Sequence, residues 1–419
     1  MKNPPCHIIG FLKGQIESDY LHTPLYRMIE HLEYINKQIF MRVFLITLGF
    51  VLLCAVDGKA QTYSIKGLIK DQDTQETIPS VHVYLNGTSI GVLSKTDGSF
   101  ILDNIPEGTY ELSFSFVGYT TETFLIDTSE LQEFYEVFLK PSVIELEELV
   151  ITPKKYGRIW EENMKVFLKN FIGTSSRARQ VDITNPKVLN FYYDYERKLF
   201  EAWAYEPLII KNDALGYQVD YYLEEFSIDY NTNQVIVLGT PAFKPLKSRR
   251  KRTNERWEKN RKEAYLGSID HFFQCLMDDD LMGCGYELRA EQRTETERRV
   301  SSQLAQASDV LQNIDDGTFE LRFYNYMNVV YLNEPETQEF IIWDATSLSE
   351  QLRAIRDNQR SVLTLNNEEK AVILKRNGYV NNPRTLLKGG YWAFEKIADL
   401  LPLDYRYSEE PSPKTVEKN

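Results

Sequence analysis

The sequence is poor in the residues that hold catalytic metals, with 5 His and 4 Cys among 419 residues. After residue 60 only His82 and His271 remain. A catalytic zinc ion needs about three protein ligands, which zinc peptidases supply through His-x-x-Glu with a distant His, or through His-Glu-x-x-His. Neither His begins such a pattern, so the sequence argues against a metallopeptidase. It assigns no catalytic, cofactor-binding or metal-binding residue.

Basic residues are outnumbered, since 48 Lys and Arg face 61 Asp and Glu and give a formal net charge of -13. Affinity for nucleic acid comes mainly from Lys and Arg, so this balance argues against a general nucleic-acid binder. One basic run stands out, at Lys247, Arg249, Arg250, Lys251 and Arg252. It predicts either contact with an anionic membrane surface, through lipid or lipopolysaccharide phosphates, or a solvated loop.

The apolar run Val43–Val56 has fourteen residues, fewer than the roughly 20 that span a bilayer. It follows Met41-Arg42 and precedes Gly58-Lys59-Ala60. This order of charged, apolar and small residues is typical of a secretory signal peptide, here residues 41–60. We therefore expect translation to begin at Met41, cleavage to follow Ala60, and residues 1–40 to be a non-native extension. The mature protein would lie in the periplasm or be associated with the outer membrane.

Two cysteines, Cys275 and Cys284, lie after the expected cleavage site. In an oxidising compartment they could pair and close a loop of about ten residues, worth roughly 2.5 kcal/mol in the chain-entropy description. Two buried free thiols fit the sequence nearly as well. The sequence leaves both alternatives open.

Residues 61–141 have the pattern of a β-sandwich. Apolar and polar residues alternate along short segments, which is the period-two pattern of strands. Asn86-Gly87, Thr96-Asp97-Gly98 and Pro106-Glu107-Gly108 place turns between these segments. About seven short strands separated by turns predict a sandwich.

Several motifs in this region, taken in order, resemble the carboxypeptidase regulatory-like domain, whose fold is a transthyretin-like or prealbumin-like β-sandwich. Gln75-Glu76-Thr77 and Ser80 depart from that family's pattern, which often has Thr-Gly before the Pro and Gly after it. The resemblance implies an accessory module without an activity of its own. The motifs are Ile65-Lys66-Gly67, Ile78-Pro79-Ser80-Val81-His82-Val83, Asn86-Gly87-Thr88, Thr96-Asp97-Gly98-Ser99-Phe100, Ile105-Pro106-Glu107-Gly108-Thr109-Tyr110 and Val117-Gly118-Tyr119.

The rest of the chain is expected to form a linker over residues 142–158, an α+β domain of unknown function over 159–405 and a disordered tail over 406–419. The expected fold class is mainly β, with a seven-stranded sandwich followed by a domain rich in antiparallel sheet with a few helices. Periodicity in the second domain predicts helices over 159–171, 255–279 and 391–401, strands within 188–243 and at 319–332, 339–343, 361–365 and 371–375, and a solvated helix or loop over 289–312.

Two short patterns match catalytic ones but are interpreted as structural. Gly87-Thr88-Ser89-Ile90-Gly91 matches Gly-x-Ser-x-Gly, yet that motif needs a strand-turn-helix elbow in an α/β sheet and here lies between sandwich strands. His271 and Cys275 are four residues apart and could form a thiol-imidazole pair. The adjacent Phe272 and Phe273 favour a packed helix instead.

Segments of the second region, among them Asn170-Phe171-Ile172-Gly173 and Gly390-Tyr391-Trp392, resemble uncharacterised bacterial envelope proteins that carry the same sandwich. We therefore expect a non-enzymatic envelope protein whose second domain binds an envelope partner or a glycan. The alternative is a hydrolase of glycan or peptide that uses carboxylates of this domain. Two facing carboxylates in an acidic cleft would favour the hydrolase, and a flat aromatic surface would favour binding.

Overall fold

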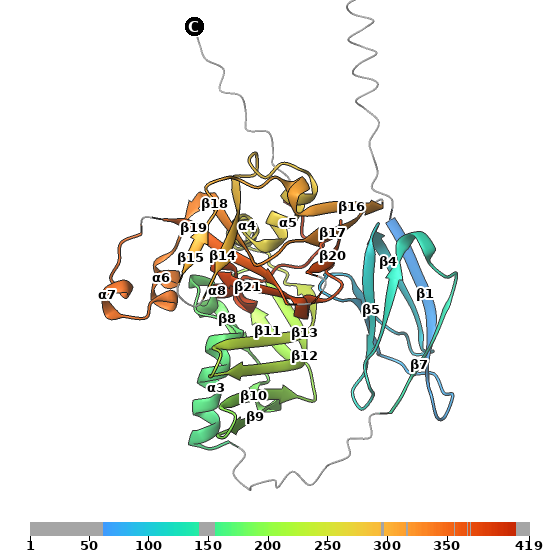
Figure 1. Ribbon diagram of the computed structural model, residues 1–419. Helices are drawn as coiled ribbons and strands as arrows, with labels where there is room; N and C mark the ends of the chain where they lie inside the picture. The colour runs from blue at the N-terminus through green and yellow to red at the C-terminus, as the bar shows by residue number, and fades with distance from the viewer. Residues whose placement is uncertain are drawn as a thin grey trace, which may run out of the picture. The chain divides into compact units, whose positions relative to one another are not determined.

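The computed structural model describes residues 62–141 and 156–407, apart from 295–296, 316, 356, 367 and 369. The expected extension, the signal peptide, most of the linker and most of the tail lie outside the described residues. The described residues all belong to one compact unit, and Figure 1 shows their strands and helices.

The predicted β-sandwich is present, and its described residues form seven strands. One sheet has the strand order β4-β1-β7 and the other the order β3-β2-β5-β6. All pairs are antiparallel except β1 and β7, which run parallel. The elements are β1 (Thr62–Asp71), β2 (His82–Leu85), β3 (Gly91–Leu93), β4 (Ser99–Pro106), β5 (Thr109–Ser115), β6 (Glu122–Asp127), the 3-10 helix η1 (Thr128–Glu130) and β7 (Tyr135–Leu139).

The alternation of residues in β1 directs one face into the sandwich core. Ile65 and Ile69 are both 0% exposed, and burial of each side chain stabilises the fold by about 1.5–3 kcal/mol. Gly67 lies between them, where the strands and core are closely packed. A Cβ at this position would lie 2.1 Å from the Tyr135 carbonyl oxygen and 2.6 Å from the Phe100 ring. Only glycine therefore fits here without a shift of the neighbouring strand.

The first part of the second region is a six-stranded antiparallel sheet with helix α3 alongside it (Figure 1). Phe167 and Phe171 of α3 are fully buried and contact the Phe226 and Tyr221 rings, with centroids 4.7 Å and 5.1 Å apart. The helix predicted over 159–171 is thus confirmed. The elements are α3 (Arg158–Phe171), η2 (Ser176–Gln180), β8 (Val181–Ile183), η3 (Pro186–Val188), β9 (Leu189–Asp194), β10 (Leu199–Ala204), β11 (Leu208–Asn212), β12 (Tyr217–Asp229) and β13 (Gln234–Pro245).

The second part has a five-stranded sheet, β15-β14-β18-β19-β21, and a three-stranded sheet, β16-β17-β20. Both are antiparallel. The elements are α4 (Lys251–Tyr265), α5 (Ile269–Met277), β14 (Tyr286–Arg293), β15 (Arg298–Val300), η4 (Ala307–Asp309), β16 (Leu311–Asp315), β17 (Thr318–Arg322), β18 (Tyr326–Pro335), α6 (Gln338–Asp344), α7 (Leu348–Gln351), β19 (Asn358–Leu365), β20 (Ala371–Lys375), η5 (Pro383–Thr385), β21 (Leu386–Gly390), α8 (Tyr391–Phe394) and η6 (Ile397–Asp399).

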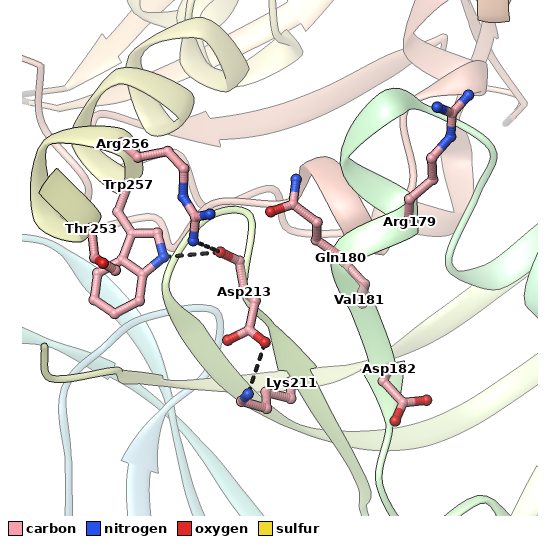
Figure 2. A pocket seen from close by; sticks show the side chains of 9 residues that line it. All are labelled: Arg179, Gln180, Val181, Asp182, Lys211, Asp213, Thr253, Arg256 and Trp257. Carbon is pink, nitrogen blue, oxygen red and sulfur yellow. Dashed lines mark hydrogen bonds and ion pairs between the residues drawn. The ribbon is translucent and has the colours of Figure 1, made fainter.

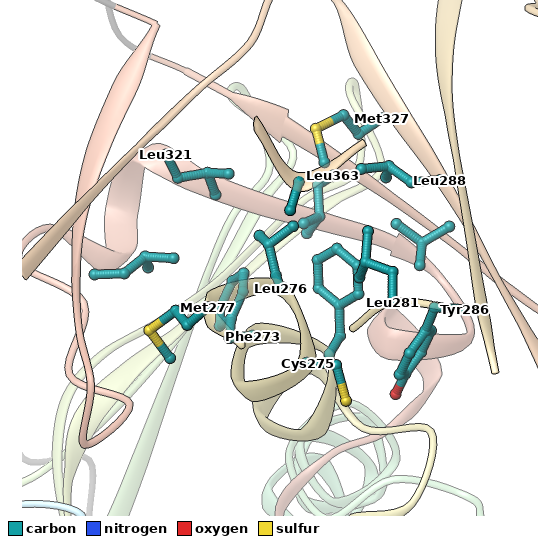
Figure 3. Close-up of a cluster of buried hydrophobic side chains, with 14 of the residues drawn as sticks. Phe273, Cys275, Leu276, Met277, Leu281, Tyr286, Leu288, Leu321, Met327 and Leu363 are labelled. Carbon is teal, nitrogen blue, oxygen red and sulfur yellow. The ribbon is translucent and has the colours of Figure 1, made fainter. Parts of the chain in front are cut away.

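Helix α5 supplies the centre of the core beneath these two sheets. Figure 3 shows its apolar side chains directed toward Leu321, Met327 and Leu363, which come from three different strands. Burial of these apolar side chains, rather than the intrinsic helix propensity of the residues, stabilises α5. Cys275 of α5 forms a disulfide with Cys284, which tethers the loop after the helix. The sequence left open a disulfide or two free thiols, and the structure shows the disulfide.

The single helix predicted over residues 255–279 is wrong, because α4 ends at Tyr265 and α5 begins at Ile269. Gly267 lies between them with a φ of +84°, a left-handed conformation that favours glycine. Ser268 then caps α5, since its Oγ accepts a hydrogen bond from the His271 amide at 3.2 Å. The apolar spacing continues through the break, which is why periodicity alone missed it.

Residues 289–312 are also corrected, because they contribute to β14, β15, η4 and β16 rather than to a solvated helix or loop. Glu291 shows how so polar a segment can form sheet. It is 1% exposed, and its carboxylate accepts hydrogen bonds from Arg293, from Arg298 at 2.9 Å and from Asn328 at 3.0 Å. Arg293 on the same strand and Arg298 on the neighbouring β15 thus neutralise the buried charge.

Three shorter predictions need correction as well. The strand predicted at 339–343 is helix α6, which Thr337 caps by accepting from the Phe340 amide at 3.3 Å. A short apolar run does not distinguish strand from helix. The single strand predicted at 319–332 is divided into β17 and β18, and the helix predicted over 391–401 is reduced to α8 followed by η6. Strand β20, by contrast, has the predicted bounds of 371–375.

Candidate functional site

The Gly-x-Ser-x-Gly pattern lies at the turn between β2 and β3, as predicted, and not at a strand-to-helix elbow. Ser89 Oγ donates to Asp404 Oδ2 at 2.5 Å, and Asp404 Oδ1 accepts from the Ser89 amide at 2.8 Å. The serine hydrogen is therefore directed to a carboxylate of the second region. This arrangement makes Ser89 a docking residue rather than a nucleophile.

The same turn makes backbone hydrogen bonds to the second region. The Gly87 amide donates to the Pro241 carbonyl at 2.8 Å, the Phe243 amide to the Thr88 carbonyl at 3.0 Å, and the Leu403 amide to the Gly87 carbonyl at 2.7 Å. Because Pro241 and Phe243 belong to β13, the turn satisfies polar groups on the edge of β13 that faces away from β12.

The outer face of the four-stranded sandwich sheet is buried at this junction. Tyr84 and Ser113 lie on that face and are 1% and 0% exposed. The Tyr84 ring stacks on Tyr222 with centroids 5.4 Å apart, and His82 Nδ1 lies 3.5 Å from the Tyr222 hydroxyl. Burial lowers the pKa of His82 to about 4, so the imidazole is neutral at pH 7. The sandwich is therefore packed against the second region and is not a loosely tethered module.

The other histidine, His271, belongs to the core and not to a thiol-imidazole pair. Its Nδ1 accepts from the Gly267 amide at 3.3 Å and lies 2.9 Å from the Tyr286 hydroxyl. Burial lowers the pKa of His271 to about 4. A ligand atom of His271 and the sulfur atoms of Cys275 and Cys284 lie within 4.8 Å of one another, but the two sulfurs are bonded to each other. In this oxidised form neither sulfur is the thiolate that zinc binds.

Three carboxyl groups of the second region, those of Asp270, Glu395 and Asp399, are buried or partly buried. Burial raises the pKa of Asp270, Glu395 and Asp399, and for Glu395, where the negative charge of Asp399 adds to the effect, the pKa is about 8. Asp399 Oδ1 accepts from Arg177 at 2.9 Å and from Ser175 at 3.0 Å.

None of these three acids lines the open groove described below. Asp270 lines a cavity of only about 20 Å³ beside Leu403, which has room for about one water molecule. Glu395 and Asp399 line neither this cavity nor the groove described below. Asp399 anchors the C-terminal segment to η2 through Arg177 and Ser175.

We expect Glu395→Gln to change how stability depends on pH. The carboxyl titrates near 4.5 in an unfolded chain and near 8 in the folded protein, so between these values the folded protein keeps a proton that the unfolded chain has lost. The stability that Glu395 contributes is therefore fully present below pH 4.5 and is lost as the pH rises through 8. In urea unfolding across this range, the free energy of the variant should rise relative to wild type.

The control for this prediction is Glu162→Gln, which neutralises a glutamate whose side chain is 56% exposed on α3. Its difference from wild type should stay nearly constant with pH. A parallel drift in both variants would contradict the role given to Glu395, because it would report the loss of any negative charge.

An open groove of about 570 Å³ lies between α4 and the segment from Arg179 to Asp182 (Figure 2). Trp257 Nε1 donates to the Asp213 carbonyl at 2.9 Å, and Arg256 donates to the same carbonyl at 3.3 Å. Lys211 Nζ pairs with the Asp213 carboxylate at 2.7 Å. The groove is lined by Arg179, Gln180, Val181, Asp182, Lys211, Asp213, Thr253, Arg256 and Trp257.

The basic run identified in the sequence leads directly into one wall of this groove. Its residues Lys251 and Arg252 begin α4, so the run is only partly a loop. All five basic side chains are exposed, and Lys251 lies 3.6 Å from Glu255. Arg252 is four residues before Arg256, and residues at this spacing share a helix face.

A cluster of tyrosines lies at the tips of two neighbouring hairpins of the six-stranded sheet. The Tyr193 ring centroid is 4.7 Å from that of Tyr195 and 5.9 Å from that of Tyr230. Tyr195 is 84% exposed and Tyr230 is 43% exposed. We call Tyr193, Tyr195 and Tyr230 the tyrosine cluster. It presents aromatic faces and hydroxyl groups together, as binding surfaces often do.

Hydrogen bonds between the two hairpins hold the tyrosine cluster in place. The Tyr230 amide donates to the Lys198 carbonyl at 3.1 Å, and Asn231 Nδ2 donates to the Arg197 carbonyl at 2.8 Å. Sequence reasoning predicted strands within 188–243 but missed the cluster, because the hairpins are separated along the chain. It also missed Arg179, Lys211 and Arg256, which come from three segments that no spacing connects.

The sandwich, its docking turn and the sheets behind it define a mainly β protein in which a β-sandwich packs against a larger region rich in antiparallel sheet. Residues 65–151 match the family model described as the CarboxypepD_reg-like domain. The N-terminal region therefore carries a carboxypeptidase regulatory-like domain, which confirms the resemblance seen in its motifs. The match does not reach the described part of the second region. No curated protein matches the chain.

Two solved structures are similar to parts of the chain. A chain of a type II cohesin-X-dockerin complex from Acetivibrio cellulolyticus is 15% identical over 27% of this chain and 78% of its own, with a TM-score of 0.16. A protein of unknown function from Bacteroides fragilis NCTC 9343, named as membrane-associated, is 16% identical over 39% of this chain and 65% of its own, also with a TM-score of 0.16. Such low TM-scores carry no argument about this protein.

One observation bears on membrane insertion. Within the described residues, the helices are all too short or too polar to cross a lipid bilayer.

Proposed function

We propose that the protein is an exported, non-enzymatic binding protein of the cell envelope, and that its second region binds an envelope glycan through the tyrosine cluster. The exposed rings of Tyr195 and Tyr230, which pack on the partly buried Tyr193 across two cross-bonded hairpins, carry this proposal. Tyrosine supplies apolar area and a hydrogen-bonding group with little loss of conformational entropy. A rigid site of this kind suits a sugar, which has both apolar faces and hydroxyl groups.

The disulfide and the sandwich support export. Disulfides persist in oxidising compartments and are rare in the cytosol, and Cys275 is bonded to Cys284 in the core of the second region. The carboxypeptidase regulatory-like domain is consistent with an accessory role, since its outer sheet face is used to pack against the second region. These two features, together with the expected signal peptide, support a periplasmic or outer-membrane location.

Tyr195→Ala tests the glycan site, because it removes the most exposed ring of the tyrosine cluster. Loss of one stacked ring should weaken the binding of soluble peptidoglycan fragments about tenfold, as expected for truncation of an aromatic anchor. Isothermal titration calorimetry with the purified mature protein measures this change. The fold should be unaffected, because Tyr195 lies at a hairpin tip outside the core.

Tyr324→Ala is the matched control, since Tyr324 is 71% exposed in the turn between β17 and β18, outside the six-stranded sheet. It should bind like wild type. Equal losses of affinity in the two variants, or no binding by wild type, would contradict the glycan proposal. A protein partner would then remain as the ligand, and crosslinking through position 195 in intact cells would detect it. Release of shortened fragments, abolished by Glu395→Gln or Asp399→Asn, would instead support the carboxylate-dependent hydrolase.

A further inference from the structure

The groove of Figure 2 gathers cations from three separate segments of the chain. Arg179 comes from η2, Lys211 from β11 and Arg256 from α4. Two acids also line it, Asp182 and Asp213. Lys211 pairs with the Asp213 carboxylate, so each partly neutralises the other, and the Lys211 ammonium keeps further N–H donors for a ligand. We propose that this groove binds a phosphate monoester, a site separate from the tyrosine cluster.

Arginine suits this ligand because its planar guanidinium matches two phosphate oxygens at once. Arg256 is held in position by its hydrogen bond to the Asp213 carbonyl, which leaves other donors of its guanidinium available to a ligand. The nearest acid to Arg179 is Glu339 at 3.9 Å, and the Arg179 side chain is 79% exposed. A phosphate monoester carries about -1.5 to -2 charges at neutral pH and can be shared by several such donors.

The neighbouring basic run strengthens the same local field. Five basic residues occupy positions 247–252 in a chain whose formal net charge is -13. Like charges so close together repel one another, and cations in the first turn of α4 also oppose the helix dipole. A bound dianion would relieve both effects. The sequence predicted contact of this basic run with an anionic surface. The structure adds an open groove beside the run, in which one phosphate can contact several donors.

The remaining lining residues set the orientation of the ligand. Thr253 and Gln180 can donate hydrogen bonds from uncharged groups. Trp257 is 7% exposed and gives the wall of α4 a rigid base. Asp182 opposes an anion, so the phosphate should lie nearer to Lys211 and Arg256. Removal of the Asp182 charge should therefore tighten binding.

The test uses glucose 1-phosphate, with glucose as the uncharged comparison, and isothermal titration calorimetry on the full mature chain. Wild type should bind the phosphate and not the sugar. Lys211→Gln/Arg256→Gln should lower the affinity at least about tenfold, because two charge-assisted contacts are lost. Asp182→Asn should raise the affinity, a gain that misfolding cannot mimic. The control Arg158→Gln/Lys165→Gln removes the same charge from exposed positions of α3 and should change the affinity less than about twofold.

Vesicles of phosphatidylcholine with phosphatidic acid distinguish a lipid source of the phosphate from a soluble one. A parallel loss of co-sedimentation in Lys211→Gln/Arg256→Gln supports the site with a lipid headgroup as the ligand, and a loss confined to glucose 1-phosphate supports it with a soluble ligand. The proposal is overturned if neither probe binds, if Asp182→Asn binds more weakly than wild type, or if the α3 control loses as much as the groove variant.

Discussion

Arg177→Ala should destabilise the protein by about 3–5 kcal/mol, the usual effect of removing one partner from a buried ion pair. Arg177 donates to Asp399 at 2.9 Å, and the two side chains are 19% and 3% exposed. Without the guanidinium, the interior would hold an uncompensated carboxylate whose pKa burial already raises. Because Asp399 anchors η6 to η2 through Arg177 and Ser175, the loss should appear as a lower free energy of unfolding in urea.

Arg158→Ala is the control, since Arg158 makes a similar 2.9 Å contact with Glu162 but is 90% exposed. Exposed pairs contribute about 0–1 kcal/mol, so this variant should remain close to wild type. Arg177→Ala/Asp399→Asn should recover part of the stability lost in Arg177→Ala, because the unpaired charge is then absent. Equal losses of unfolding free energy in Arg177→Ala and Arg158→Ala would show that burial of the ion pair does not determine its contribution to stability.

Gly87→Val should loosen the junction between the sandwich and the second region. Gly87 has a φ of +74°, which a β-branched residue adopts only at a cost of about 1–3 kcal/mol. A Cβ there would also lie 3.0 Å from Leu403. Since Gly87 bonds to Pro241 and Leu403 through its backbone, we expect faster hydrogen exchange at the Phe243 and Leu403 amides.

Gly118→Val separates backbone strain from docking. Gly118 has a φ of +85° and no atom within 4 Å of the position that a Cβ would occupy. It should therefore lose a similar amount of stability from strain while the Phe243 and Leu403 amides stay protected. Equal loss of protection in both variants would mean that exchange reports general destabilisation and not the junction.

The docked sandwich limits where this protein can recognise a ligand. The outer sheet face that carries Tyr84 and Ser113 is occupied by the second region. The Gly87–Gly91 turn is likewise used for docking. The tyrosine cluster and the groove, by contrast, lie on the second region with exposed side chains. We therefore expect recognition to depend on that region, while the sandwich stabilises it.

The sandwich was the part most accessible to sequence reasoning because its signals are local. Alternation in β1 predicts which residues are buried, and glycine-containing turns separate consecutive strands. The helix over Phe167 and Phe171 was found for the same reason, since its apolar residues repeat on one side. The Gly-x-Ser-x-Gly pattern was also interpreted correctly, because the surrounding strand pattern excluded an elbow.

The amino-acid sequence by itself therefore determined the β-sandwich, the mainly β class and the argument against a zinc peptidase, all of which follow from residue types and short-range spacing. Only the tertiary structure decided that Cys275 bonds to Cys284, that Glu291 is neutralised within a sheet, and which cations and tyrosines meet. The physical reason is that charge neutralisation and side-chain clustering depend on contacts between distant segments. Those contacts exist only once the strands have paired and the sandwich has docked.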